Sequence, residues 1–161
     1  MIRSILYATD LGFYAPYVLQ HALSQSQAFK AELYVVHAVE PLGLLAHSVL
    51  RTYLGDAQLQ DLQAQGLDAV LTSIEARVLE SFKEELDSMQ QGHDLIRAVQ
   101  AIQGDPADVI TTQAKALGVD LVVIGTRSQG GDAPTPLGRT AHRVVQTCTV
   151  PVHVVPMLPP L

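Results

Sequence analysis

The chain of 161 residues contains one cysteine, Cys148, and only 16% of its residues are charged. A single thiol cannot form an internal disulfide, and a cysteine metal cluster needs more ligands, so we expect the reducing interior of a cell. No apolar run approaches the roughly 20 residues that span a bilayer. The first residues show no charged leader ahead of a long apolar core. We therefore expect no signal peptide, no membrane partner and a cytoplasmic location.

Positive charge is also scarce, since 10 Lys and Arg face 16 Asp and Glu, for a net charge of −6. This balance gives no field that would hold a polyanion, which argues against nucleic acid and anionic membrane surfaces as partners. Apolar residues make up 48% of the chain. That composition and length are typical of one compact domain, and we expect a single domain over residues 1–161.

Strand and helix patterns alternate along the chain. Short apolar runs predict strands at about 2–8, 32–39, 95–102, 120–125 and 151–155, with about four helices between them. The second run is almost continuously apolar, as in strands that are covered on both faces. We predict an α/β fold with one five-stranded parallel open sheet, strand order 3-2-1-4-5, and helices on both faces. Residues 41–66 are expected to form a variable helical excursion.

Two helices carry clear signals. A long helix from about 68 to 89 is expected to bury one apolar stripe, formed by Val70, Ile74, Val78, Phe82, Leu86 and Met89. Another is expected to begin with Asp105 as N-cap and Pro106 as its first residue, and to end at Gly118. In open parallel sheets, ligands bind at the carboxyl ends of the strands where the winding reverses. That point lies between the first and fourth strands, so Asp10 and Gly125 should bound any site.

The segment from Gly125 to Asp132 is rich in glycine and is followed by the start of a helix at Gly138. Backbone amides of such a turn, together with the positive end of the next helix, suit a phosphate. The alternative is a flexible surface loop closed by glycine and proline. The segment lacks the lysine and hydroxyl pair of a P-loop, and the first strand leads to no dinucleotide glycine triplet.

Four features in order resemble the universal stress protein family, of the adenine-nucleotide α-hydrolase-like superfamily. They are a first strand that ends in Asp10, the sequence Gly104-Asp105-Pro106, the strand Asp120 to Gly125, and Cys148-Thr149-Val150-Pro151-Val152 before the last strand. The likeness covers nearly the whole chain outside residues 41–66.

The resemblance implies a bound adenine nucleotide, ATP or AMP, with Mg²⁺ only alongside ATP. ATP-binding members show glycine, two residues, glycine, nine residues, glycine and a hydroxyl residue. Here the spacing is kept, but Ser128 replaces a glycine and Arg139 replaces the hydroxyl residue. Adenine and ribose would lie near Ala8, Thr9, Asp10 and Val39. The phosphates would lie near Gly125, Ser128, Gly138, Arg139 and Thr140, and Ile124 and Arg127 would also belong to the nucleotide site.

The two departures bear on the phosphates in different ways. Ser128 adds a side chain where backbone must approach a ligand, although its hydroxyl can donate to phosphate. Arg139 is unfavourable at the amino end of a helix by about 0.3–1 kcal/mol unless an anion compensates. A guanidinium suits a phosphate or carboxylate. The alternative is that Arg139 points into water and the pocket is empty.

Catalysis and metal binding have little support in the sequence. Nothing is seen to pair with Asp10 as a second carboxylate for Mg²⁺, and no base stands beside the phosphates, so no catalytic residue is predicted and enzymatic activity is left open. The histidines are scattered without ligand spacing, and we expect surface or packing roles and no metal site. They are His21, His37, His47, His93, His142 and His153.

The last strand would form an apolar edge of the sheet, which is a pairing hazard unless covered. In the family this strand pairs with its copy across a two-fold axis. The resemblance therefore implies a homodimer through residues 150–157, with Val150, Val152, His153, Val154 and Val155 in the interface. The alternative is an edge that the chain's own tail covers.

Three functions remain open. The first is a nucleotide-responsive regulator of the stress response that changes its affinity for an unknown protein partner. The second is a dimeric interaction module of the same family without nucleotide. The third is a slow ATP hydrolase or phosphotransferase.

Overall fold

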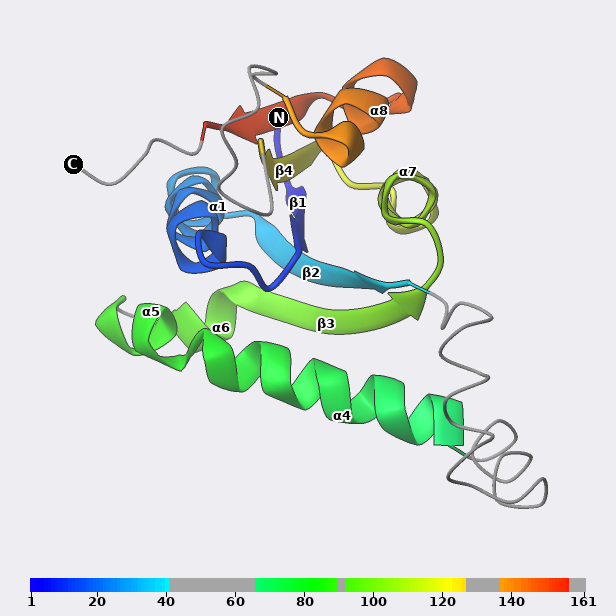
Figure 1. Ribbon diagram of the computed structural model, residues 1–161. Helices are drawn as coiled ribbons and strands as arrows, with labels where there is room; N and C mark the ends of the chain where they lie inside the picture. Colours follow the sequence, from blue (N-terminus) through cyan, green and yellow to red (C-terminus); the bar gives the residue numbers. More distant parts are fainter. Residues whose placement is uncertain (41–65, 90–91, 127–136, 157–161) are drawn as a thin grey trace.

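The computed structural model describes residues 1–40, 66–89, 92–126 and 137–156, and these contain a five-stranded sheet (Figure 1). Its strand order is β3-β2-β1-β4-β5, and every neighbouring pair is parallel. The predicted fold class and strand order are confirmed. The strands are β1 (Ser4–Thr9), β2 (Glu32–Val39), β3 (Ile96–Gln103), β4 (Leu121–Gly125) and β5 (Val152–Val155).

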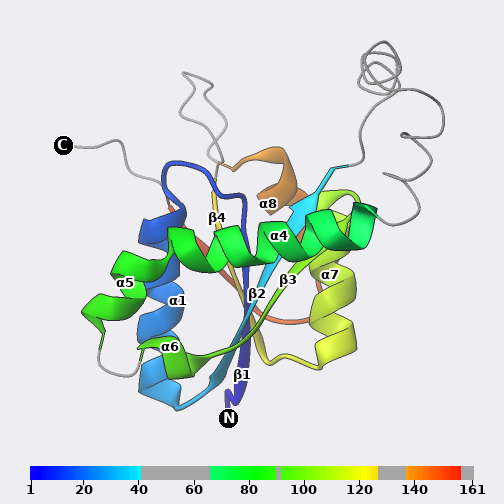
Figure 2. The same ribbon diagram turned by 90° about the horizontal axis from the view of Figure 1, so that it is seen from below.

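Helices cover both faces of this sheet (Figures 1 and 2). On one face lie α1 (Ala15–Phe29), α4 (Gly66–Ser81), α5 (Lys83–Ser88) and α6 (Gly92–Leu95). On the other face lie α7 (Pro106–Leu117) and α8 (Arg139–Thr147). No helix in the described part of the chain is long and apolar enough to cross a membrane.

The core is divided by the sheet because successive strand residues point to opposite faces. In β1, Ile5 and Tyr7 pack on the α1 face, whereas Leu6 packs on the α7 face. In β4, Val123 faces α1 and Val122 faces α7. Burial on both faces is why these central strands read as continuous apolar runs.

The predicted caps of α7 are present. The side chain of Asp105 accepts a hydrogen bond from the backbone N–H of Asp108, 3.3 Å away, and Pro106 begins the helix. Gly118 closes the helix at φ 62°, a left-handed conformation that glycine adopts without a Cβ clash. Arg143 on α8 contacts both carboxylates, Asp105 at 2.8 Å and Asp108 at 3.1 Å. The cap of one helix is therefore also a tie to the next.

The long helix expected from about 68 to 89 is divided into α4 and α5, and the short helix α6 follows it. The described residues therefore form six helices, and the prediction of about four was wrong. The division falls at Phe82, whose N–H bonds to the carbonyl of Leu79 in a tightened turn. Phe82 is only 1% exposed, and its ring centroid lies 6.0 Å from that of Tyr7. Packing of this ring beneath the sheet accompanies the turn that separates α4 from α5.

The apolar stripe of this segment is buried at its centre but not at its start. Val78, Phe82 and Leu86 are at most 1% exposed, whereas Val70 is 48% exposed near the beginning of α4. Periodicity identified the buried face correctly. It did not identify where that face leaves the sheet.

Two substitutions of the same kind on α4 should separate buried from exposed positions. We expect Val78→Ala to lower the free energy of unfolding by about 2 kcal/mol, because it removes buried methyl groups and leaves a cavity. The control, Val70→Ala, should change it by no more than about 0.5 kcal/mol. Urea unfolding followed by circular dichroism measures both, and equal losses would contradict this packing of α4.

Candidate functional site

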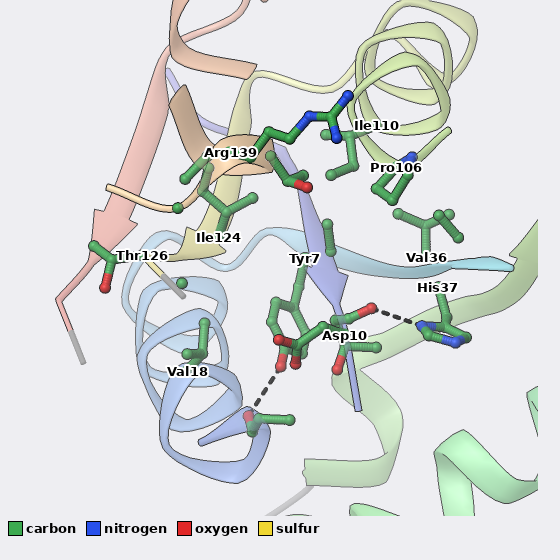
Figure 3. Close-up of a pocket in the computed structure, with 18 of the residues that line it drawn as sticks. Tyr7, Asp10, Val18, Val36, His37, Pro106, Ile110, Ile124, Thr126 and Arg139 are labelled. Atoms are coloured by element: carbon green, nitrogen blue, oxygen red, sulfur yellow. Dashed lines mark hydrogen bonds between the residues drawn. The ribbon is translucent and has the colours of Figure 1, made fainter. Parts of the chain in front are cut away.

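A pocket of about 440 Å³ opens at the carboxyl ends of β1 and β4 (Figure 3). This is the place where the winding of the sheet reverses, and where open parallel sheets bind ligands. Its lining comes from β1, β2, β4 and the starts of α1, α7 and α8. The lining residues are Tyr7, Ala8, Thr9, Asp10, Ala15, Val18, Val36, His37, Ala38, Glu40, Pro106, Ile110, Ile124, Gly125, Thr126, Gly138, Arg139, Thr140 and Ala141.

The turn after β1 holds Asp10 at the pocket. Oδ1 of Asp10 accepts a hydrogen bond from the N–H of Gly12 at 2.8 Å, and the Thr9 hydroxyl accepts one from the N–H of Leu11 at 3.1 Å. Leu11 between them adopts φ 58°, a left-handed conformation that is uncommon for a leucine. These two side-chain bonds stabilise that turn, so the carboxylate has a defined position.

Tyr7 lies below this turn, on the α1 side of the pocket. Its hydroxyl donates a hydrogen bond to the carbonyl of Ala15, 2.9 Å away, which joins β1 to the first turn of α1. Burial is the main reason why the pKa of Tyr7 lies well above its ordinary value. Tyr7 is therefore a neutral donor at physiological pH.

The end of β2 contributes more polar groups than the sequence indicated. Nδ1 of His37 lies 2.8 Å from the carbonyl oxygen of Thr9, and because a carbonyl only accepts, Nδ1 carries the proton. Glu40 follows the strand and lines the same pocket as Asp10. Glu40 was not among the residues predicted for the site. Its signal was its place directly after a strand, because the carboxyl ends of parallel strands share one edge.

The end of β2 also contributes apolar residues to the lining. Ala38 is part of the lining, whereas Val39, the residue predicted from the resemblance, is not. Val36, His37 and Ala38 all line the pocket, so at this end of β2 residues of both faces contribute to it.

The start of α8 forms the opposite wall. Gly138 is the N-cap in an extended conformation, and its N–H donates to the carbonyl of Thr126 at 2.6 Å. Arg139 and Thr140 follow in the first turn and line the pocket. Figure 3 shows the guanidinium of Arg139 directed across the pocket toward Ile110 and Pro106 of the α7 segment. The first N–H groups of a helix have no acceptor within the helix, so this wall suits an anion.

The pocket therefore has two chemically different sides. Two carboxylates, Asp10 and Glu40, stand at the ends of β1 and β2, and the guanidinium of Arg139 stands at the start of α8. The first side can accept hydrogen bonds from amino or hydroxyl groups, and the second can bind a negatively charged group. The described residues contain no group of three or more histidine, cysteine, aspartate or glutamate side chains able to hold a metal.

The structure brings most of the predicted pocket residues together, although whether they bind a ligand stays a prediction. Ala8, Thr9, Asp10, Ile124, Gly125, Gly138, Arg139 and Thr140 all line the pocket. Arg127 and Ser128 lie outside the described residues. The lining also includes His37, Glu40, Pro106, Ile110 and Thr126, which the sequence analysis did not select.

The residues predicted for a dimer interface lie on or next to β5. Val150, Val152 and Val154 are partly buried against α7 and α8, while Val155 is fully buried on the α1 face. His153 also faces α1, where its Nδ1 lies 3.0 Å from the amide nitrogen of Gln25. The side chains of β5 are thus largely used within one chain, and what the strand offers a partner is its backbone edge.

Comparison with known proteins gives a consistent result. The model of the universal stress protein family matches residues 1–156. A universal stress protein of Thermus aquaticus, encoded in the 3′ region of a QAH/OAS sulfhydrylase, is 30% identical over 156 residues, which cover 96% of this chain and 99% of that protein. Universal stress protein YxiE of Bacillus subtilis is 27% identical, with 96% and 99% covered.

Solved structures share the fold. UspA from Lactobacillus plantarum superposes with a TM-score of 0.67 at 19% identity, covering 96% of this chain and 97% of that one. A universal stress protein in complex with cAMP gives a TM-score of 0.60 at 16% identity, covering 96% of each chain. At these identities the solved structures bear on the fold alone. The family model and the Thermus relative, by contrast, establish family membership. The chain belongs to the universal stress protein family.

Proposed function

We propose that this protein is a homodimeric regulator of the stress response that binds an adenine nucleotide, ATP or AMP, and transmits its occupancy to a protein partner. The observation that carries the proposal is the pocket at the β1–β4 switch point, with carboxylates on one side and Arg139 with the start of α8 on the other. Its volume of about 440 Å³ falls within the roughly 300–1,000 Å³ of small-molecule sites.

The two sides of the pocket match the two ends of a nucleotide. The base and ribose, which carry amino and hydroxyl donors, would lie beside Asp10, Ala38 and Glu40. The phosphate would lie at the amino end of α8 and accept hydrogen bonds from Arg139. An arginine at this end of a helix is unfavourable without an anion, so a bound phosphate accounts for its presence. The cAMP complex of a similar family member supports a nucleotide as the ligand class.

Magnesium enters this proposal only with ATP. Mg²⁺ is usually held by one or two carboxylates together with substrate phosphates. Asp10 and Glu40 are carboxylates of the same pocket, so they are the residues of the described chain that would hold it. AMP needs no such ion.

The second candidate is a dimeric interaction module that has lost the nucleotide. It is favoured by the two departures from the ATP-binding pattern, Ser128 and Arg139, which place larger side chains where that pattern has glycine and a hydroxyl residue. A slow ATP hydrolase or phosphotransferase is the third candidate. The observation that favours it is the presence of two carboxylates, Asp10 and Glu40, in the lining of the pocket.

Dimerisation through β5 is supported by a difference between the two edges of the sheet. At the β3 edge, the N–H of Ala101 donates to Oε1 of Glu75 on α4 at 3.0 Å, so a side chain occupies that backbone group. At the β5 edge, the carbonyl of Pro151 accepts from the N–H of Val122 in β4, and that of Val155 accepts from the N–H of Thr126 directly after β4. By alternation the N–H and C=O of Val152 and Val154 point away from β4. These outward groups would pair with the same strand of a second copy.

Calorimetric titration with AMP and with ATP, with and without Mg²⁺, tests the nucleotide. We expect wild-type protein to bind and Arg139→Ala to bind about tenfold or more weakly, because a charge-assisted hydrogen bond contributes about 1.5–3 kcal/mol. The control is Arg143→Ala, one turn further along α8, whose guanidinium contacts Asp105 and Asp108 instead of the pocket. It should keep its affinity.

Measurements on the wild-type protein also distinguish the three candidate functions. Failure of the folded wild type to bind either nucleotide, with no adenine compound released on heat denaturation, would favour the interaction module. Release of phosphate that depends on Mg²⁺ would favour the hydrolase. Equal affinity in wild type and Arg139→Ala would remove the proposed role of the guanidinium.

A second pair of variants tests which residue near the end of β2 meets the nucleotide. Ala38→Leu adds bulk to the lining and should reduce nucleotide affinity about tenfold or more, since overpacking typically costs 1–3 kcal/mol. Val39→Leu adds one methylene at a position outside the lining and should leave affinity within about twofold. Greater loss in Val39→Leu than in Ala38→Leu would show that the ligand meets the other residue.

Analytical ultracentrifugation tests the dimer. Wild-type protein should sediment as a dimer, and Val154→Pro should shift it to monomer because proline removes an outward N–H without removing a bond to β4. The control Val154→Thr keeps the N–H and a β-branched side chain, so it should stay dimeric. A wild-type monomer, or a Val154→Pro variant that is folded and still dimeric, would contradict pairing through β5.

A further inference from the structure

Two histidines meet where α1 lies beside the edge strand β5. The ring centroids of His21 and His153 are 6.1 Å apart, and both residues are half-buried. Tyr17, one turn before His21 on α1, packs edge-on against the His21 ring with centroids 5.0 Å apart. All three residues lie outside the lining of the pocket, so this cluster is separate from the proposed nucleotide site.

The backbone of β5 determines where His153 would lie in the proposed dimer. In each copy, the outward N–H and C=O groups belong to Val152 and Val154. An antiparallel register that pairs Val152 of one copy with Val154 of the other uses all of these groups in both copies. In that register His153 stands directly opposite His153 of the second copy, as a non-hydrogen-bonded pair with Cα atoms about 4.5 Å apart. Opposite residues of an antiparallel pair share one face of the sheet, so the two imidazoles would be neighbours.

His153 makes its contact within the chain as a neutral ring. The amide nitrogen of Gln25 lies 3.0 Å from Nδ1 of His153. An amide nitrogen only donates hydrogen bonds, so Nδ1 accepts this one and carries no proton. A proton added to Nδ1 would oppose the donor and remove the bond.

The elements around the two rings offer no carboxylate to balance a positive charge. The helix α1, the strand β5 and its neighbour β4 contain no Asp, Glu, Lys or Arg, and their titratable side chains are Tyr17, His21 and His153. Burial lowers the pKa of His153 below its ordinary value, and repulsion from His21 lowers it further. A second copy placed across β5 would add another histidine to this surface.

We propose that the two copies of His153, each beside His21, face each other across the axis of the β5-paired dimer, and that their protonation separates the copies. This inference rests on the dimer of the proposed function. Like charges directly opposite each other on paired strands are destabilising, so the dimer binds fewer protons than two monomers do. Its affinity is therefore full while His153 is neutral. It falls as the pH drops through the pKa of His153 in the monomer, which lies below the ordinary value of 6.5.

Analytical ultracentrifugation at about pH 7.5 and about pH 5.0 tests the proposal. In the wild type we expect the dissociation constant of the dimer to rise about tenfold or more at the lower pH, since each excluded proton contributes up to about a factor of ten per pH unit. His153→Gln removes the titrating group but keeps a polar side chain, so its dimer should be equally tight at both values. The control is His93→Gln, which replaces an exposed histidine paired with Asp87 at 2.7 Å and should keep the wild-type pH dependence.

NMR titration of the imidazole resonances is a second measurement, and it leaves His153 unchanged. The pKa of His153 should be lower in the wild-type dimer than in the Val154→Pro monomer, because the dimer opposes the charge. A wild-type monomer at the higher pH would contradict the proposed dimer itself. Equal wild-type affinity at the two pH values, or a His153→Gln variant with wild-type pH dependence, would overturn the role of His153 and leave the dimer in place.

Discussion

The rest of the structure depends on the pairing of β1 with β4 at the centre of the sheet. The chain leaves β1 toward one face through α1 and leaves β4 toward the other face through α8. The connections therefore diverge at the carboxyl ends of the two strands, and side chains of the intervening elements do not close the space between them. Asp10 and Gly125 border that space because each stands at the end of its strand. The order of the strands therefore creates the pocket, and the side chains only determine its lining.

Sequence patterns that act locally were sufficient for the framework. Apolar runs located all five strands, and Asp105 with Pro106 and Gly118 located the ends of α7, because caps and strand burial depend on neighbouring residues. The division of α4 from α5 was not predictable in this way. It accompanies contact between Phe82 and Tyr7, which are 75 positions apart in the sequence and meet only in the folded sheet.

The candidate site was predicted in outline and missed in detail for the same reason. The ends of the predicted strands and the family resemblance selected Asp10, Gly138 and Arg139, all of which line the pocket. Sequence patterns did not select Glu40, which comes into the site through the parallel pairing of β2 with β1, or His37 and Ala38, which line the pocket at the end of β2. The rings of His21 on α1 and His153 on β5 lie next to each other, with centroids 6.1 Å apart. The sequence could not predict this contact, because it depends on the position of β5 relative to α1.

Arg143 connects the two helices that border the pocket, α7 and α8. Its guanidinium holds Asp105, which also caps α7, so the start of α7 and the body of α8 share a carboxylate. Pro106 and Arg139, one from each helix, face the same space. Both ion pairs of Arg143 are exposed, and exposed ion pairs contribute little to stability, so they mark where the two helices adjoin and do not by themselves set the shape of the pocket.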